Sequence, residues 1–320
     1  MTASTVGLTE AYGRAREEAA RAIVGQEATF ELLFAALVAG GHVLLEGVPG
    51  TAKTLLARTL AQLTSGEFRR VQFTPDLMPS DVVGTTVFDM RGGGFHLRRG
   101  PIFCNVLLGD EINRAPAKTQ AALLEGMEER QATIDGESHP LPEPFIVVAT
   151  QNPIEYEGTY PLPEAQLDRF MFKLLVGYSP AEIEREVVRR HLAGFAMSRL
   201  AEAGVRPVLT PAELMTCRAE LEQVALGSDV LGYIVAIGRA TREAADLQLG
   251  SSIRGPLALA LASRALAALR GRAYVTPDDV KELVGPALRH RVILKPDAEI
   301  EGLTTDDVLG RILAGLEVPR

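Results

Sequence analysis

Apolar residues follow two patterns along this chain, and a change from one pattern to the other divides the sequence into two parts. In the first part, short apolar runs at residues 43–45, 106–108 and 145–149 alternate with segments of helical spacing. Such runs are typical of buried strands, and their alternation with helices predicts an α/β domain with a parallel sheet over residues 1–178. Only helical spacing recurs afterwards, which predicts a small all-α domain over residues 179–320.

The first apolar run leads into a turn rich in glycine and proline, and a helix with regularly spaced leucines follows the turn. This order is the layout of a phosphate-binding loop, in which backbone N–H groups and the helix dipole hold phosphate oxygens. The ammonium group of Lys53 would meet the β- and γ-phosphates of ATP, and the hydroxyl group of Thr54 would ligate Mg²⁺. The predicted loop comprises Gly47, Val48, Pro49, Gly50, Thr51, Ala52, Lys53 and Thr54.

Ala52 stands where the usual phosphate-loop pattern has its second glycine. If the chain stays in right-handed backbone space there, alanine costs little, whereas a positive φ would cost on the order of 1 kcal/mol or more. The alternative interpretation is a glycine-rich turn that binds nothing. The pair Lys53-Thr54 at the start of the helix favours the phosphate loop.

Polar residues also follow two later apolar runs. Asp110 and Glu111 end the second run, where a parallel sheet would bring them beside the phosphate loop. Asp110 would then hold Mg²⁺ through water, and Glu111 would polarise the water that attacks the γ-phosphorus. Asn152 follows the third run and is a candidate to orient this water, although Asn before Pro is also ordinary turn chemistry.

Upstream of the first strand, Ile23 and Val24 precede Gly25 between two segments of helical spacing. In phosphate-loop proteins an apolar pair at this place often lines the adenine pocket, so Val24 and Gly25 are predicted nucleotide contacts. Two aliphatic residues before a glycine are also common as plain core residues, and that alternative stays open.

Two further segments have the composition of β-hairpins. Residues 74–101 contain three consecutive glycines, and residues 131–144 contain Asp135-Gly136, a strong hairpin-turn signal. The first segment is either a solvated surface hairpin or an arm that offers Phe95, Arg98 and Arg99 to a partner.

Composition narrows the class of protein. Of the 320 residues, 47% are hydrophobic and 23% charged, the net charge is −8 and the isoelectric point is near 5.3. This acidic balance argues against general nucleic-acid binding, which needs clustered Lys and Arg. Two cysteines and five scattered histidines predict neither a disulfide framework nor a metal site made by protein ligands alone. The absence of a signal peptide or membrane span predicts a cytoplasmic protein.

Four motifs together resemble the MoxR family of AAA+ ATPases, and the resemblance runs from about Ile23 to Pro296. The motifs are Gly47-Val48-Pro49-Gly50-Thr51-Ala52-Lys53-Thr54, Asp110-Glu111-Ile112-Asn113-Arg114-Ala115, Ala149-Thr150-Gln151-Asn152-Pro153 and Glu164-Ala165-Gln166-Leu167-Asp168-Arg169-Phe170. Alanine in place of the second loop glycine is itself usual in that family.

The resemblance implies an AAA+ core, a helical lid and a ring of subunits, usually six, with ATP bound at each subunit boundary. It implies that Arg169 is the arginine finger that reaches the neighbour's γ-phosphate, and that Arg254 is the sensor 2 residue that reports lid position to the nucleotide. It also implies that the two hairpins line the ring's central pore. The expected output is chaperone-like remodelling or metal-cofactor activation of client proteins, with an adapter that carries a von Willebrand factor A domain.

Three alternatives stay open. The chain could be the ATPase subunit of a metal chelatase, which resembles this family and differs mainly in its partner. A nucleic-acid motor is a second alternative, which the acidic balance disfavours. A scaffold that binds ATP and barely hydrolyses it is a third, which the presence of Glu111 and Arg169 disfavours.

Overall fold

The protein is built around a five-stranded parallel sheet. We describe residues 7–90, 93–153, 160–196 and 199–319 of a computed structural model. The strand order across the sheet is β2-β5-β8-β1-β9, and every neighbouring pair is parallel. The strands are β1 (Val43–Glu46), β2 (Phe68–Gln72), β5 (Val106–Asp110), β8 (Ile146–Gln151) and β9 (Phe172–Leu175).

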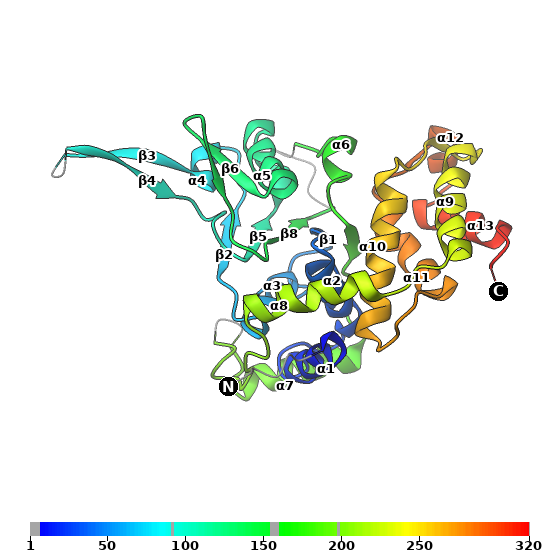
Figure 1. The fold of residues 1–320 in the computed structure, drawn as a ribbon, viewed down its shortest axis with the longest axis horizontal. Coiled ribbons are helices and arrows are strands. Elements are labelled where there is room, and N and C mark those ends of the chain that lie inside the picture. The colour runs from blue at the N-terminus through cyan, green and yellow to red at the C-terminus, as the bar shows by residue number, and fades with distance from the viewer. Residues whose placement is uncertain (1–6, 91–92, 154–159, 197–198, 320) are drawn as a thin grey trace.

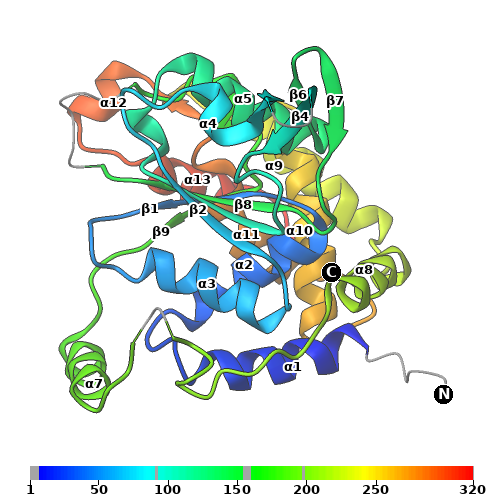
Figure 2. The same cartoon turned by 90° about the vertical axis from the view of Figure 1, so that its left-hand side faces the viewer.

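Helices cover both faces of this sheet (Figure 2). Successive residues of β1 point to opposite faces: Leu44 packs in the core on one side, whereas Val43 and Leu45 pack in the core on the other. Such two-sided burial explains why the strands appear in the sequence as continuous apolar runs rather than as alternating ones. The covering helices are α2 (Glu27–Ala39) and α3 (Lys53–Leu63) on one face and α4 (Pro79–Val83) and α5 (Ala117–Glu129) on the other.

Both segments with hairpin composition form antiparallel hairpins that leave the sheet. The first is the long arm of Figure 1, and the cross-strand neighbours Phe88 and Phe95 lie edge to face on it with ring centroids 5.1 Å apart. Arg91 and Gly92 at its tip lie outside the described residues. The strands are β3 (Gly84–Asp89) and β4 (Gly94–Arg99) in the first hairpin, and β6 (Gln131–Ile134) and β7 (Glu137–Pro140) in the second.

The second half of the chain is helical, as predicted, with one small exception. The exception is the two-stranded sheet of β10 (Leu247–Leu249) and β11 (Ile293–Leu294), whose short runs lack a periodicity that distinguishes them from the ends of helices. The helices are α7 (Ala181–Leu192), α8 (Pro211–Glu220), α9 (Ser228–Glu243), α10 (Arg254–Leu269), α11 (Pro277–Leu288), α12 (Pro296–Ile300) and α13 (Thr305–Gly315). Within the described residues, the helices are all too short or too polar to span a bilayer.

The remaining elements are α1 (Leu8–Ala19), α6 (Glu164–Leu167) and the 3₁₀ turns at Ile112–Arg114 and Leu221–Gln223. α10 packs against α1, α2 and α11, so the helical half shares one hydrophobic core with one face of the sheet.

Arg291 joins the helical half to the sheet through a buried ion pair. Its Nε donates to Oδ1 of Asp168 at 2.7 Å, and its other nitrogens donate to the backbone carbonyls of Asp168, Phe170 and Met171. Burial lowers the pKa of Arg291, and the bond to Asp168 opposes that shift. A buried guanidinium is tolerated here because nearly all its donors have acceptors.

His42 fixes the start of β1 in a similar manner. Its Nδ1 accepts the N–H of Val147 on β8, and its Nε2 donates to the carbonyl oxygen of Met127 on α5. The bond from Val147 needs an unprotonated Nδ1, and burial lowers the pKa of His42 to about 3.

Replacing Arg291 by alanine would remove a charged donor from the Asp168 carboxylate and from three backbone carbonyl groups. We expect the free energy of unfolding to fall by about 3–5 kcal/mol, measured by urea denaturation. The control Arg311→Ala removes an exposed pair with Asp246 and should cost less than about 1 kcal/mol. Equal losses in the two variants would contradict the role given to Arg291.

The protein should lose stability in mild acid because of His42. The unfolded ring takes up a proton near pH 6.5, whereas the folded ring does so only near its pKa of about 3, so stability falls as the pH drops between those values. His42 alone should remove about 2 kcal/mol between pH 7 and pH 5, measured by denaturation at each pH. His42→Gln should flatten this slope; the slope from His290, whose pKa is also lowered, is common to both proteins.

Candidate nucleotide-binding site

The predicted phosphate loop connects β1 to α3 at the carboxyl edge of the sheet. Gly47 opens the loop where the chain passes closest to β9. A Cβ atom there would lie 2.2 Å from the carbonyl oxygen of Val176, so no other residue fits without moving the backbone. The N–H of Gly47 donates to the carbonyl of Gln151 on β8, which ties the loop to the next strand.

Ala52 has φ +63° and ψ +14°, which is the left-handed conformation. Of the two conformations considered in the sequence analysis, the structure therefore has the one with positive φ. The residue therefore carries backbone strain of about 1–2 kcal/mol. It directs the first turn of α3 toward the loop, and that turn has neither a side-chain cap nor an acidic residue. Uncapped N–H groups at a helix N-terminus are a binding site for an anion such as a phosphate group.

Lys53 folds back over the loop. Its Nζ donates to the carbonyl oxygens of Gly47 at 2.5 Å and Val48 at 2.9 Å. Burial lowers the pKa of Lys53, and the charges of Asp110 and Glu111 partly offset that shift. The ammonium group is therefore held inside the loop, close to both carboxylates.

Asp110 is the last residue of β5 and Glu111 follows it; β5 is separated from β1 by β8 alone. The hydroxyl group of Thr150 on β8 connects them, since it donates to Oδ1 of Asp110 at 2.5 Å and accepts the N–H of Glu111 at 2.9 Å. Glu111 has φ +57°, which is uncommon for this residue type and typical of strained functional positions. The bond to Thr150 stabilises this backbone conformation.

The edge strand β2 supplies partners that the sequence did not reveal. Arg70 donates through Nη2 and Nε to Oδ2 of Asp110, at 2.7 and 3.1 Å. Gln72 donates to Oε2 of Glu111 at 2.8 Å, and Arg114 forms an ion pair with the same oxygen at 3.1 Å. The contacts of Arg70 and Gln72 depend on β2 lying beside β5, and the residue types alone gave no signal for that neighbour.

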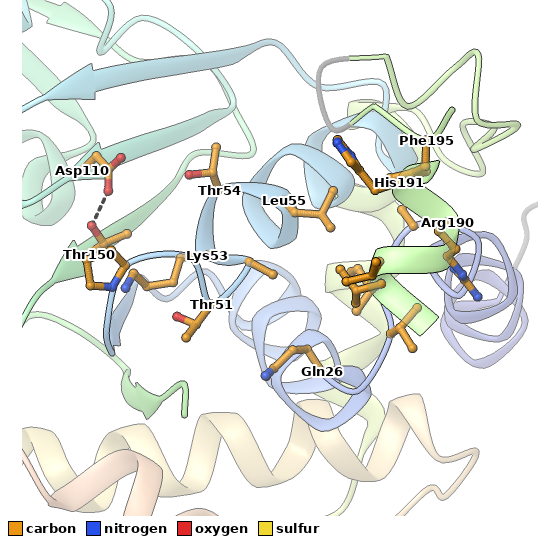
Figure 3. Close-up of a pocket in the computed structure, with 18 of the residues that line it drawn as sticks. Gln26, Thr51, Lys53, Thr54, Leu55, Asp110, Thr150, Arg190, His191 and Phe195 are labelled. Atoms are coloured by element: carbon orange, nitrogen blue, oxygen red, sulfur yellow. Dashed lines mark hydrogen bonds between the residues drawn. The ribbon is translucent and has the colours of Figure 1, made fainter. Parts of the chain in front are cut away.

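A cavity of about 520 Å³ lies over the loop, and Figure 3 shows Lys53, Thr51 and Thr54 on one side of it, with Asp110 and Thr150 beyond them. The predicted residues that line this cavity are Val24, Pro49, Gly50, Thr51, Ala52, Lys53, Thr54, Asp110, Glu111 and Asn152. The structure thus brings together the phosphate loop, the acidic pair and the amide that follow three different strands. Gly47 and Val48 contribute the carbonyl groups that hold Lys53 instead.

The other end of the cavity is apolar, and α7 forms much of it. Val187, Val188 and Leu192 line the cavity although they are half or more exposed, and Ile23 faces the same space. An apolar slot beside a phosphate site suits a flat nucleobase. In the sequence analysis, α7 falls within the helical domain of residues 179–320. Helical spacing does not show against which element a helix packs, so the contact of α7 with the cavity could not be predicted.

Contacts with the turn after α1 hold α7 in place. Arg190 donates to the carbonyl oxygens of Ala20 and Arg21, which lie in the turn directly after the end of α1 at Ala19. Gly25 has φ +75°, and a Cβ atom there would lie 2.6 Å from the side chain of Ile183. Because Gly25 has no Cβ atom, α7 can pack closely against it. Gly25 does not itself line the cavity.

Arg169 and Arg254 lie outside this cavity. Both pair with Glu128 at the end of α5: Arg169 through Nη2 at 2.6 Å, and Arg254 through Nη2 at 2.6 Å. The two arginines predicted to meet a γ-phosphate are thus together, and they do not line the cavity of their own chain.

The donor set around the loop fits a nucleotide with Mg²⁺. A hydroxyl group (Thr54) and a carboxylate (Asp110) are the oxygen donors that Mg²⁺ prefers, and Lys53 with the first turn of α3 supplies the positive end for phosphates. Both oxygens of Asp110 already accept protein hydrogen bonds, which suits contact with the ion through water rather than directly.

The fold and this site define a phosphate-loop nucleotide-binding protein of the AAA+ class. Residues 42–172 match the ATPase family associated with various cellular activities (AAA), and residues 239–312 match the AAA lid domain. The chain belongs to the MoxR family of AAA+ ATPases.

Three relatives illustrate the similarity. The chain is 43% identical to Chaperone MoxR1 of Mycobacterium tuberculosis, over 96% of this chain and 82% of the relative. It is 44% identical to the uncharacterized protein YeaC of Bacillus subtilis, over 96% and 94% of the two chains. A solved structure of a candidate ATPase from Cytophaga hutchinsonii superimposes with a TM-score of 0.90 at 40% identity, covering 98% of this chain and 96% of that one.

Removing the Thr150 hydroxyl should test the link between the two acids. In Thr150→Val, Asp110 loses a donor and the N–H of Glu111 loses its acceptor, so the free energy of unfolding should fall by about 1–3 kcal/mol in urea denaturation. The control Thr216→Val removes an exposed bond within α8 and should change stability by less than about 0.5 kcal/mol. A Thr150→Val protein as stable as the control would show that the hydroxyl is not needed.

Proposed function

We propose that the protein hydrolyses ATP and uses the cycle to remodel or activate client proteins in the cytoplasm. The observation that carries the proposal is the meeting of Lys53, Asp110, Glu111 and Asn152 around one cavity, from loops that follow three neighbouring strands. Lys53 and the first turn of α3 bind the phosphates, and Thr54 and Asp110 hold Mg²⁺. When bound, the ion neutralises charge on the β- and γ-phosphates.

Glu111 accepts a proton from the attacking water, and the amide group of Asn152 orients that water. For Glu111 to act, its carboxylate has to exchange the donors Gln72 and Arg114 for the water. Ile23, Val24 and the apolar face of α7 receive the nucleobase.

The arginines complete a neighbour's site in our proposal. Arg169 and Arg254 are held together on Glu128 and do not line the cavity of their own chain, so a shared site at a subunit boundary gives both a function. The assembly is a closed ring, most simply of six copies, whose boundaries are all alike. Arg254 then links the position of the helical half to the nucleotide of the neighbouring subunit.

The output of the cycle rests on the family. We propose chaperone-like action on protein clients, as the name of the mycobacterial relative suggests, with an adapter that carries a von Willebrand factor A domain. The first hairpin offers a contact surface, since Phe88, Met90 and Phe95 are more than half exposed on it.

Complementation between two inactive variants tests this proposal. Glu111→Gln and Arg169→Ala should each reduce the ATPase rate by at least about 100-fold, because one lacks the water-activating group and the other the trans charge. Rings that contain both variants have some boundaries where an intact Glu111 meets an intact Arg169. Their rate should therefore recover to roughly a quarter of wild type in an equal mixture.

Arg199→Ala, which removes an exposed pair with Glu202, should leave the rate unchanged and serves as the matched control. A protein that stays monomeric with ATP, or mixed rings that assemble without recovery, would refute the shared site. A scaffold would show no loss of rate in Glu111→Gln.

A further inference from the structure

Glu128 is the residue on which Arg169 and Arg254 converge, and neither the motifs nor the family resemblance drew attention to it. Arg169 donates to its Oε2 through Nε at 2.7 Å and approaches the same oxygen through Nη2 at 2.6 Å. Arg254 donates to the other oxygen, Oε1, at 2.6 Å. One carboxylate therefore accepts two guanidinium groups, one on each oxygen.

The position of Glu128 on its helix is unfavourable for a carboxylate. It lies in the last turn of α5, where the helix dipole favours cations, and α5 has no basic residue in that turn. The two arginines supply the compensating positive charge from outside the helix.

The contact bridges the two halves of the molecule. Arg169 follows α6 in the sheet domain, whereas Arg254 is the first residue of α10 in the helical half. Arg291 holds the backbone on both sides of Arg169 through Asp168, Phe170 and Met171, so the segment that carries Arg169 is already fixed. What Glu128 adds is the direction of the two long side chains.

The cluster is also open to a partner. The side chains of Arg169, Glu128 and Arg254 are 28%, 36% and 43% exposed, and two guanidinium groups on one carboxylate leave a net positive charge. Without Glu128, the two guanidinium groups would repel each other. Arg169 would keep its bond to the carbonyl oxygen of Ala165, and Arg254 would keep its ion pair with Asp168, so each would be held by a separate acceptor.

We propose that Glu128 is a positioning residue that holds Arg169 and Arg254 side by side, so that they reach the γ-phosphate of the neighbouring subunit as one unit. This inference rests on the shared site of the proposed function. The phosphate adds to the pair of arginines on their exposed side, and the carboxylate stays in place beneath them.

The kinetic test is Glu128→Gln, which keeps the shape of the side chain and removes its charge. Misdirected arginines act at the chemical step, so kcat should fall by about 10- to 100-fold while KM for ATP changes less than about twofold. The matched control is Glu129→Gln, the same change one residue along α5, and it should keep the wild-type rate. Glu128→Asp retains the charge on a shorter side chain and should recover part of the loss.

Mixing two variants shows whether Glu128 acts on the site of its own subunit or on the site of the neighbouring subunit. Rings formed from Glu128→Gln and Glu111→Gln subunits should recover activity, because the intact Glu111 of one variant meets the intact arginine cluster of the other. No recovery in assembled mixed rings would mean that Glu128 serves its own subunit's site or its folding, and would overturn the inference. A rate above wild type in Glu128→Gln would also overturn it, since the carboxylate would then restrain the arginines.

The mixture of Arg169→Ala with Glu111→Gln separates this inference from the proposed function. If that mixture recovers activity and the Glu128→Gln mixture does not, the shared site stands and only the role of Glu128 fails. If neither mixture recovers, the shared site itself fails. Thermal denaturation of Glu128→Gln, expected to match the Glu129→Gln control within about 2 °C, excludes misfolding as the cause of a lower rate.

Discussion

Most of this structure depends on the ion pair and hydrogen bonds that Arg291 forms with residues 168–171. One buried guanidinium group satisfies a carboxylate and three carbonyl groups in a segment that leads directly into β9. Because Arg291 belongs to the helical half and Asp168 to the sheet domain, the two halves cannot separate without leaving a buried charge unpaired. The same hydrogen bonds fix the backbone around Arg169. Arg291 therefore both attaches the helical half to the sheet domain and determines where Arg169 lies.

The function that we propose uses two surfaces that do not meet within one chain. One is the cavity over the phosphate loop, formed at the carboxyl edge of the sheet and closed by α7. The other is the cluster of Arg169, Arg254 and Glu128. In our proposal both surfaces meet the same anion: Lys53 contacts the phosphates from one copy, and the two arginines contact them from the next copy. Such a head-to-tail contact generates a ring where the rotation between copies closes.

Chemistry that lies in contiguous residues could be predicted from the sequence, and chemistry that depends on neighbours in space could not. The phosphate loop was predictable from the pair Lys53-Thr54 at the start of a helix, and Asp110-Glu111 from its place behind that loop, since an apolar run that ends in Asp-Glu is common by itself. Arg70 and Gln72 were not, since their contacts with the acids need β2 beside β5. The sequence did not predict the strand β9, because its apolar run is too short to distinguish a strand from other structures. It did not predict that α7 lines the cavity either, because helical spacing does not show against which element a helix packs. Family resemblance assigned roles to Arg169 and Arg254, but only the structure locates them on one carboxylate.

Two residues at the site break local backbone rules, and their placement explains why. Ala52 and Glu111 both have positive φ and line the cavity; Ala52 is the N-cap residue of α3 at the end of the phosphate loop, and Glu111 is the first residue after β5. At Ala52 the strained turn points the N-terminus of α3 at the phosphates, and at Glu111 it turns the carboxylate away from the axis of β5. The strand β8 bonds to both segments: the N–H of Gly47 at the start of the phosphate loop donates to Gln151, and the N–H of Glu111 donates to Thr150. The central strand of the sheet therefore fixes where the phosphate loop begins and directly stabilises the backbone of Glu111.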